Sequence, residues 1–472
     1  MISTMPVMPD IPRQPASFRD PSGFLFRREG ALYRQVNQRY RAEYDHLHQS
    51  GLYQDLVDRN WLIPHQEVSG DFAQDDRAYR VIQPSVLEFI SYPYEWSFSQ
   101  LKDAALLTLN IQKRALRYGM SLKDSSAYNI QFQVETGKPI LIDTLSFEMY
   151  AEGRPWVAYR QFCQHFLAPL ALMALTDVRL SQLSRVHIDG VPLDLASSLL
   201  PKRTYLNFGF LTHIHLHAMA QRRFAGTDVR ESQPKRQMSK TAFQGLIDSL
   251  AKNTEKLTWQ PADTDWGDYY QFTNYSDESM AQKAKLVETF TNQVSPQVVW
   301  DLGANTGRFS RIASQQGIKT LAFDLDPAAV EKNYRRIKKE KEGNLLPLVL
   351  DLTNPSPGIG WQNQERASLS ERANADLIYA LALVHHLAIS NNLPLEMIAA
   401  YFRELAPWLV IEFIPKRDSQ VRRLLNSRED IFDAYTREGF EAAFERYYTI
   451  HAQEDIQGSE RKLYLMQTKQ TL

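Results

Sequence analysis

Acidic residues and a glycine-containing turn in the C-terminal half could bind a polar ligand. The apolar run Val298–Leu302 contains Asp301, and the turn Gly303-Ala-Asn-Thr-Gly307 follows it before a helix-like segment begins at Arg308. A strand that turns tightly into a helix exposes backbone N–H groups, which suit an anionic or polar ligand. Glycine allows the positive φ, or the close approach of a ligand, that such a turn needs.

Acids also follow the next two predicted strands. Asp324 comes directly after Thr320–Phe323, and Asp351 comes directly after Leu346–Leu350. The alternation of strands with helices predicts a parallel, doubly wound sheet of the α/β class. Ligands of such sheets bind at the carboxyl ends of the strands, so we expect the acids and the turn to lie together.

These groups fit S-adenosylmethionine, which carries hydroxyls, an exocyclic amine and positive charge. Asp324 can accept hydrogen bonds from both ribose hydroxyls, and Asp351 can accept one from the adenine amine. Asp301 and the turn around Gly303 can bind the amino acid end. The cationic sulfonium makes a site rich in carboxylates tolerable. The sequence therefore predicts cofactor binding by Asp301, Gly303, Asn305, Gly307, Asp324 and Asp351.

The C-terminal half resembles the class I S-adenosylmethionine-dependent methyltransferases over roughly residues 260–470. The motifs that carry the resemblance are Asp301-Leu-Gly-Ala-Asn-Thr-Gly307, Phe323-Asp-Leu-Asp-Pro327, Leu350-Asp351 and Ala375-Asp-Leu-Ile-Tyr-Ala-Leu-Ala-Leu-Val-His-His386. The resemblance implies a seven-stranded, Rossmann-like sheet whose last strand runs antiparallel. Asn305 replaces the middle glycine that is common in this family. The whole layout is also similar to nodulation-associated methyltransferase-like proteins.

A dinucleotide-binding fold is the alternative for this half. Its fingerprint is G-x-G-x-x-G, whereas the spacing here is G-x-x-x-G with an acid two residues before the first glycine. The spacing favours the methyltransferase. A methyltransferase-like fold that no longer binds the cofactor is a further alternative.

Candidate catalytic residues follow strands four and five of the predicted sheet. Methyl transfer needs a base only if the acceptor keeps a proton at neutral pH. His385 and His386 lie after strand four, and Glu412 lies at the end of strand five. Ala380-Leu-Ala-Leu383 stands where amino-methylating enzymes carry an Asn/Asp-Pro-Pro-Tyr/Phe motif. We therefore expect a methyltransferase that acts on oxygen or carbon of a small molecule or glycan-like substrate.

The N-terminal half contains a second arrangement of acids. Asp124 precedes Asn129 by five residues, and a short hairpin then leads to Asp143 at the end of an apolar strand. This arrangement is similar to the catalytic loop and metal-binding acid of protein-kinase-like folds. Lys123 stands where those folds usually have an arginine, and no glycine closely follows Asp143. The alternative is a β-hairpin whose Asp and Asn side chains cap turns.

Three histidines, His213, His215 and His217, alternate with apolar residues. A strand would place them on one face, where they could bind zinc, whereas a helix would scatter them. No carboxylate motif accompanies them, so the sequence predicts no metal site.

Length and composition bound the remaining properties. The chain has 472 residues. Its net charge of −1 gives no support for nucleic-acid binding. The single cysteine, Cys163, excludes a disulfide framework within one chain.

We expect a cytoplasmic protein without a membrane span. The expected segments are an irregular tail (1–20), an α+β accessory domain (21–224), a linker (225–240) and the methyltransferase domain (241–472). The accessory domain could bind a protein partner, and a non-catalytic regulatory protein is the alternative function.

Overall fold

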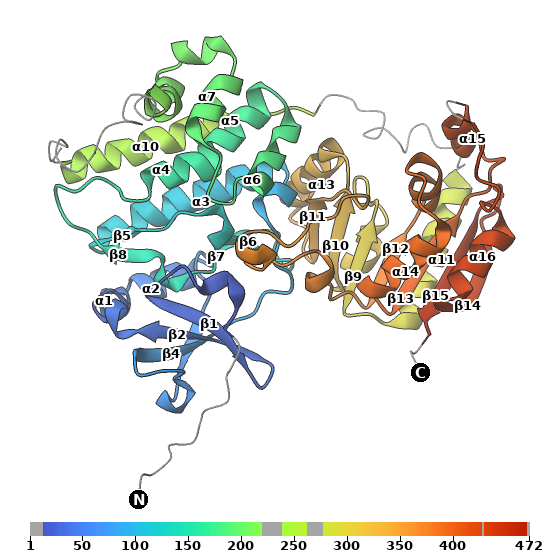
Figure 1. The fold of residues 1–472 in the computed structure, drawn as a ribbon, viewed down its shortest axis with the longest axis horizontal. Coiled ribbons are helices and arrows are strands. Elements are labelled where there is room, and N and C mark those ends of the chain that lie inside the picture. Colours follow the sequence, from blue (N-terminus) through green and yellow to red (C-terminus); the bar gives the residue numbers. More distant parts are fainter. Residues whose placement is uncertain (1–12, 220–237, 262–276, 427–428, 470–472) are drawn as a thin grey trace, which may run out of the picture.

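The computed structural model describes residues 13–219, 238–261, 277–426 and 429–469. Two halves lie side by side, with the N-terminal half in blue to green and the C-terminal half in yellow to red (Figure 1). The expected tail and linker lie largely outside the described residues. Among the helices that are described, none is long and apolar enough to cross a membrane.

The N-terminal half begins with a four-stranded antiparallel sheet in the order β1-β2-β4-β3. Helices α1 and α2 connect β2 to β3, and Gly51 separates the two helices with a φ of 84°. The bounds are β1 (Gly23–Arg28), β2 (Ala31–Asn37), α1 (Arg41–Gln49), α2 (Leu52–Asp58), β3 (His65–Val68) and β4 (Ala78–Pro84).

The long helix α3 (Phe98–Arg117) is the centre of this half. Ser97 caps its first turn by accepting a hydrogen bond from the backbone N–H of Gln100. Two short strand pairs follow it, β5 with β8 and β6 with β7, and further helices complete the half. Their bounds are β5 (Met120–Leu122), β6 (Ile130–Phe132), β7 (Pro139–Leu141), β8 (Phe147–Met149), α4 (Tyr159–Phe162), α5 (Ala168–Leu175), η8 (Val178–Gln182), α6 (Leu183–Val186), α7 (Leu193–Leu199) and α8 (Phe208–Phe210).

The C-terminal half is built on a seven-stranded sheet in the order β11-β10-β9-β12-β13-β15-β14. Strands β9 to β13 pair in parallel, whereas the last strand, β15, runs antiparallel to both β13 and β14. The seven strands and the antiparallel last strand confirm the sheet that the sequence predicts. The strands are β9 (Val298–Leu302), β10 (Lys319–Asp324), β11 (Leu345–Val349), β12 (Leu377–Ala380), β13 (Trp408–Phe413), β14 (Tyr448–Asp455) and β15 (Lys462–Thr468).

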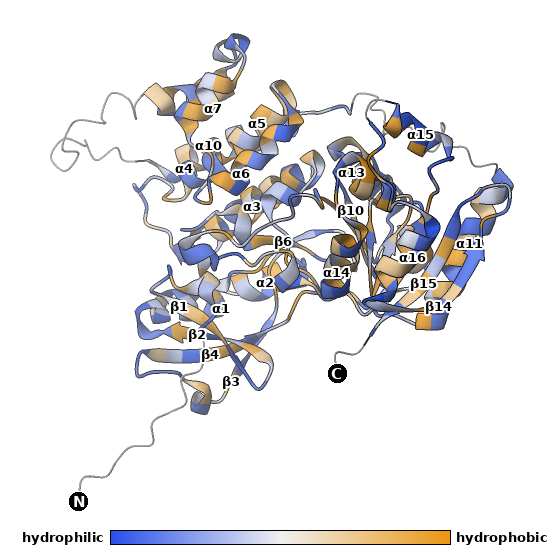
Figure 2. Ribbon diagram, turned by 45° about the vertical axis from the view of Figure 1, so that its right-hand side comes forward, coloured by the Kyte–Doolittle hydropathy of each residue, from blue (hydrophilic) through white to orange (hydrophobic). Residues whose placement is uncertain are grey.

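Helices cover this sheet because its strands are apolar on both faces. Every residue of β9 and β12 is buried, as expected for a parallel sheet between helical layers. Helices α13 and α14 each combine buried hydrophobic residues with hydrophilic ones, and both colours run along them in Figure 2. The helices are α11 (Asp277–Val294), α12 (Ser310–Ser314), α13 (Pro327–Glu340), α14 (Leu395–Leu405), α15 (Ser419–Leu425) and α16 (Arg437–Glu445).

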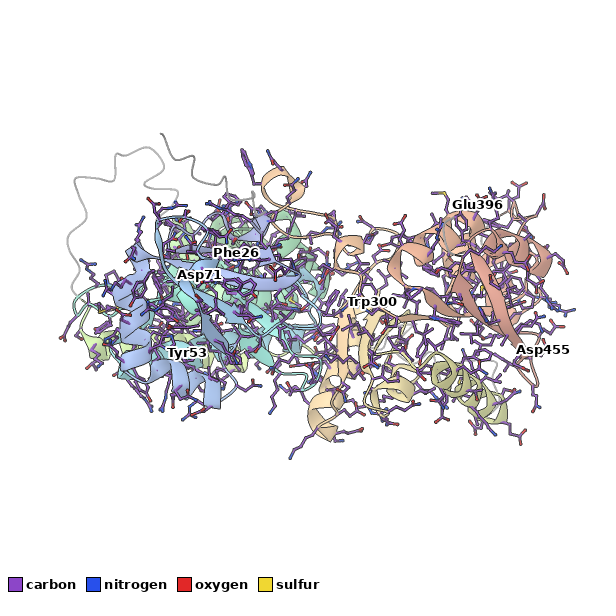
Figure 3. The ribbon with its side chains drawn as sticks, turned by 90° about the horizontal axis from the view of Figure 1, so that it is seen from below. Phe26, Tyr53, Asp71, Trp300, Glu396 and Asp455 are labelled. Atoms are coloured by element: carbon purple, nitrogen blue, oxygen red, sulfur yellow. The ribbon has the colours of Figure 1, made fainter. Side chains whose placement is uncertain are left out.

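The two halves share a buried interface along the β11 edge of the sheet (Figure 1). Trp300 of β9 lies near this junction, and its ring centroid is 5.6 Å from that of Phe89 in the N-terminal half (Figure 3). The backbone N–H and hydroxyl of Ser99, at the start of α3, donate to the buried carboxylate of Glu331 on α13. The described parts of the two halves therefore form one packed unit.

Helix α10 (Lys240–Lys256) packs against α3 of the N-terminal half. Its apolar side chains, Phe243, Ile247 and Leu250, are buried in the same hydrophobic cluster as residues of α3. The sequence predicts that this segment belongs to the C-terminal domain. The domain division stays a prediction, and the packing of α10 places that helix with the N-terminal half.

Candidate functional site

A cavity of about 660 Å³ lies at the carboxyl ends of β9, β10, β11 and β12. Most of the site residues predicted from the sequence line it, because the ends of parallel strands meet at one edge of the sheet. They are Asp301, Gly303, Asn305, Asp324, Asp351 and His386. Gly307, His385 and Glu412 do not line it.

The turn after β9 depends on residues in the left-handed region. Gly303, Asn305 and Gly307 have φ values of 78°, 51° and 77°. Asparagine tolerates this conformation better than most residues with a side chain, so Asn305 can replace a glycine here. The backbone N–H of Asn305 donates to Asp324 Oδ2 over 2.7 Å, which joins the turn to the end of β10.

Packing also disfavours a side chain at position 307. A Cβ atom there would lie 2.5 Å from Asn333 Nδ2 and 2.7 Å from Arg311 Nη1. Gly307 therefore shapes the turn from behind the cavity, without facing the ligand space.

Two carboxyl groups in the cavity have raised pKa values. Burial is the main cause for Asp301, whose pKa is raised to about 7, and the nearby Asp324 raises it further. Burial also raises the pKa of Asp324 to about 6, although the N–H groups of Asp326 and Asn305 oppose this shift. A ligand that brings positive charge or hydroxyl donors would favour the ionised form of both groups.

Asp351 occupies the β11 end of the cavity. Its Oδ1 accepts hydrogen bonds from the backbone N–H and the hydroxyl of Thr353, at 2.8 Å and 2.6 Å. These contacts fix the carboxylate at the start of the loop that follows β11.

Glu412 belongs to a buried ion pair behind the cavity wall. Its Oε2 accepts hydrogen bonds from Lys283 Nζ at 2.7 Å and from the backbone N–H of Ala382 at 2.8 Å. Glu412 is fully buried, and Arg461 Nη1 lies 3.7 Å from its other oxygen. The carboxylate thus holds Lys283 and the strained Ala382, whose φ is 51°, in place.

The two neighbouring histidines have different surroundings. His385 is fully buried, and neither ring nitrogen has a hydrogen-bond partner among the described atoms. Burial lowers the pKa of His385 well below its usual value and that of His386 to about 4. Both rings are therefore neutral near pH 7, and of the two only His386 lines the cavity.

Lys283 and Arg179 also line the cavity, and neither is among the site residues predicted from the sequence. Lys283 stands on the buried face of α11 with Met280, Val287 and Phe290. A lysine within such an apolar stripe is a sequence signal for a buried, paired charge, because an unpaired charge is rarely buried. Arg179 comes from η8 in the N-terminal half, and no local pattern marks it.

Nodulation protein NoeA of Rhizobium meliloti (strain 1021) is 36% identical to this chain over 459 residues. The alignment covers 96% of this chain and 95% of NoeA. The chain belongs to the NoeA family. No family model matches it.

Solved structures resemble this NoeA family member over part of its length. The PH0226 protein of Pyrococcus horikoshii OT3 is 17% identical, with a TM-score of 0.31, and covers 43% of this chain and 99% of its own. The N-methyltransferase NodS of Bradyrhizobium japonicum WM9 is 11% identical, with the same TM-score of 0.31, and covers 41% and 99%. The assignment of the fold rests on the strand order and directions of the sheet.

The acids of the N-terminal half lie together in this NoeA family member. Asp143 forms an ion pair with Arg34 of β2 and accepts a hydrogen bond from the Ser146 hydroxyl at 2.7 Å. Asp124 accepts hydrogen bonds from the Gln161 side chain and the Ser126 backbone N–H, at 2.8 Å and 2.9 Å. Asp143 and Asp124 each also accept a hydrogen bond from a backbone N–H two residues later, Leu145 and Ser126, as turn-capping side chains do. The resemblance to protein kinases stays a prediction.

The histidines at 213–217 lie on a helical segment and serve packing. The ring of His213 bonds with the Tyr159 and Ser249 hydroxyls, and that of His215 with the Ser197 and Thr204 hydroxyls. Within the described ranges, no group of three or more His, Cys, Asp or Glu side chains is placed to hold a metal ion.

Replacing Asp324 with asparagine should stabilise the ligand-free protein at pH 8. The folded-state pKa of about 6 lies above the ordinary value of 3.8, so folding favours the protonated carboxyl. Stability is therefore lost as pH rises from about 4 through 6, and the neutral amide avoids that loss. We expect Asp324→Asn to raise the free energy of unfolding by about 1–3 kcal/mol at pH 8 and by little at pH 4.5. Urea unfolding at the two pH values measures the difference, and an equal effect at both would contradict the assignment.

Proposed function

We propose that this NoeA family member is a class I S-adenosylmethionine-dependent methyltransferase. The observation that carries the proposal is the meeting of Asp301, Asp324 and Asp351 with the turn after β9 in one cavity. Three carboxylates at the ends of successive strands suit a ligand that combines hydroxyls, an amine and positive charge. S-adenosylmethionine has all of these groups.

The cavity fits this cofactor at each of its ends. Asp324 would accept hydrogen bonds from the ribose hydroxyls, and Asp351 from the adenine amine. Leu325, which is 62% exposed, would cover apolar ring surface when the ligand is bound. Asp301 would face the amino group, and Lys283, which lines the cavity close to Asp301, would face the carboxylate.

When bound, the cofactor supplies an activated methyl group, and the residues of the chain position the acceptor and exclude water. The remaining wall is mostly apolar, with Met280, Phe309, Leu381, Leu383, Leu387 and Leu424. His386 lies on the same wall and is neutral, so it can accept a proton from the acceptor. Its low pKa makes it a weak base, which suits an acceptor whose own proton is acidic. We propose an oxygen or carbon acceptor on a small molecule or glycan-like substrate.

Calorimetry on the intact chain tests the proposal. We expect S-adenosylmethionine and S-adenosylhomocysteine to bind at one site, and NAD to give no heat of binding. An intact protein that binds neither sulfur compound would support the alternative, a non-catalytic regulatory protein. Binding of NAD alone would favour the dinucleotide-binding fold.

A further inference from the structure

The N-terminal half contacts the loop that carries Asp351. Arg185 on α6 donates to the Asn354 side-chain oxygen at 3.2 Å and to the Pro355 carbonyl at 3.3 Å. The Ser356 hydroxyl donates to Glu95 of the N-terminal half. The segment Val178–Val186 therefore lies against the β11 end of the cavity, next to Asp351 and Thr353.

Arg179 extends from this segment to the cavity. Among the described residues that line the cavity, Arg179 is the one from the N-terminal half. Leu325, Asp351 and Thr353 of the C-terminal half line the same cavity. The Nε and Nη2 of Arg179 donate to the two oxygens of Asp177 at 2.9 Å and 2.6 Å. This two-pronged contact holds the guanidinium plane in a defined orientation, although 80% of the side chain is exposed.

We propose that Arg179 covers the adenine ring of the bound cofactor. This inference rests on the proposed function. The Asp351 end of the cavity is the end assigned to adenine, and a planar guanidinium stacks well on an aromatic face. The pairing with Asp177 already fixes the plane, so little side-chain freedom is lost on binding. The N-terminal half then forms part of the cofactor site of the C-terminal sheet.

The variant Arg179→Ala in the intact chain tests this role by calorimetry with three ligands. They are S-adenosylmethionine, S-adenosylhomocysteine and 5′-methylthioadenosine, which keeps the adenosine but lacks the amino acid. We expect the affinity for all three to fall by a similar factor, about threefold to tenfold. Arg179→Lys should lose most of the same affinity, because it keeps the charge but not the planar group.

The matched control is Arg77→Ala. Arg77 is also an exposed arginine of the N-terminal half that pairs with an aspartate two residues earlier, Asp75, but it does not line the cavity. We expect this control to leave the affinity for all three ligands unchanged, and both alanine variants to melt at temperatures close to that of the parent.

Two results would overturn the inference while leaving the proposed function intact. One is a parent protein that binds all three ligands and an Arg179→Ala variant that binds them equally well. The other is a loss confined to the two ligands with an amino acid end, which would place Arg179 at the opposite end of the cofactor. A parent protein that binds none of the three would instead reject the proposed function itself.

Discussion

Replacing Asp324 with alanine is expected to weaken the binding of S-adenosylmethionine by about 100-fold or more. Hydrogen bonds to a charged group contribute about 1.5–3 kcal/mol each, and the ionised carboxylate would accept two from the ribose. The same substitution also removes the acceptor for the Asn305 backbone N–H, which holds the turn after β9. Calorimetry with S-adenosylmethionine and S-adenosylhomocysteine on the intact chain measures the loss.

The control for this variant is Asp376→Ala. The Asp376 carboxylate also accepts two backbone N–H groups, from Gln297 and Val298, but at the amino end of the sheet, away from the cavity. We expect it to lower stability without changing the affinity for either ligand. Equal affinities in Asp324→Ala and the parent protein would move the cofactor away from the end of β10.

The pH dependence of binding should follow from the same carboxyl groups. With pKa values of about 7 for Asp301 and about 6 for Asp324 in the ligand-free protein, both groups gain protons as pH falls below 7. The ligand favours the ionised forms, so its affinity should fall from pH 8 to pH 5. The gain in stability expected for Asp324→Asn and the loss of affinity expected for Asp324→Ala have the same cause, the buried charge of Asp324. This charge destabilises the ligand-free fold and contributes to ligand binding.

The cofactor end of the site could be predicted because its signals are local in the sequence. Each acid directly follows or ends an apolar run. The alternation of strands and helices predicts a parallel sheet, in which the carboxyl ends of the strands meet at one edge. Asn305 has a φ of 51°, in the left-handed region that asparagine tolerates, so it can stand in place of a glycine. By contrast, Glu412 looked like a free acid at a strand end, because its partner Lys283 is 129 residues away in the sequence.

The contribution of the N-terminal half to the cavity and to the junction could not be predicted from the sequence, because it depends on contacts between distant segments. No spacing rule links Arg179 to Asp351, or the start of α3 to Glu331 on α13. The boundary expected at residue 241 rested on composition, which says nothing about the surface that α10 packs against. Periodicity identifies the buried face of a helix but not the element that covers it.

The buried ion pair between Glu95 and Arg372 should make the stability of the two halves depend on each other. Arg372 Nη2 donates to Glu95 Oε1 at 2.6 Å, and its Nη1 donates to the Ile90 carbonyl at 2.6 Å. The two side chains are 6% and 2% exposed. The guanidinium also lies over the ring of Tyr92, 4.3 Å from its centroid. Removal of the arginine alone would leave a buried carboxylate without its counter-ion.

We therefore expect Arg372→Ala to lower the free energy of unfolding by about 3–5 kcal/mol. Urea unfolding followed by tryptophan fluorescence measures this loss, because Trp300 lies at the junction of the halves. The exposed pair of Arg336 and Glu340 provides the control, and Arg336→Ala should cost less than about 1 kcal/mol. The double variant Glu95→Gln, Arg372→Met should recover part of the loss, since it leaves no unpaired charge. A loss in Arg372→Ala as small as that in Arg336→Ala would show that this ion pair contributes little to the stability of the junction.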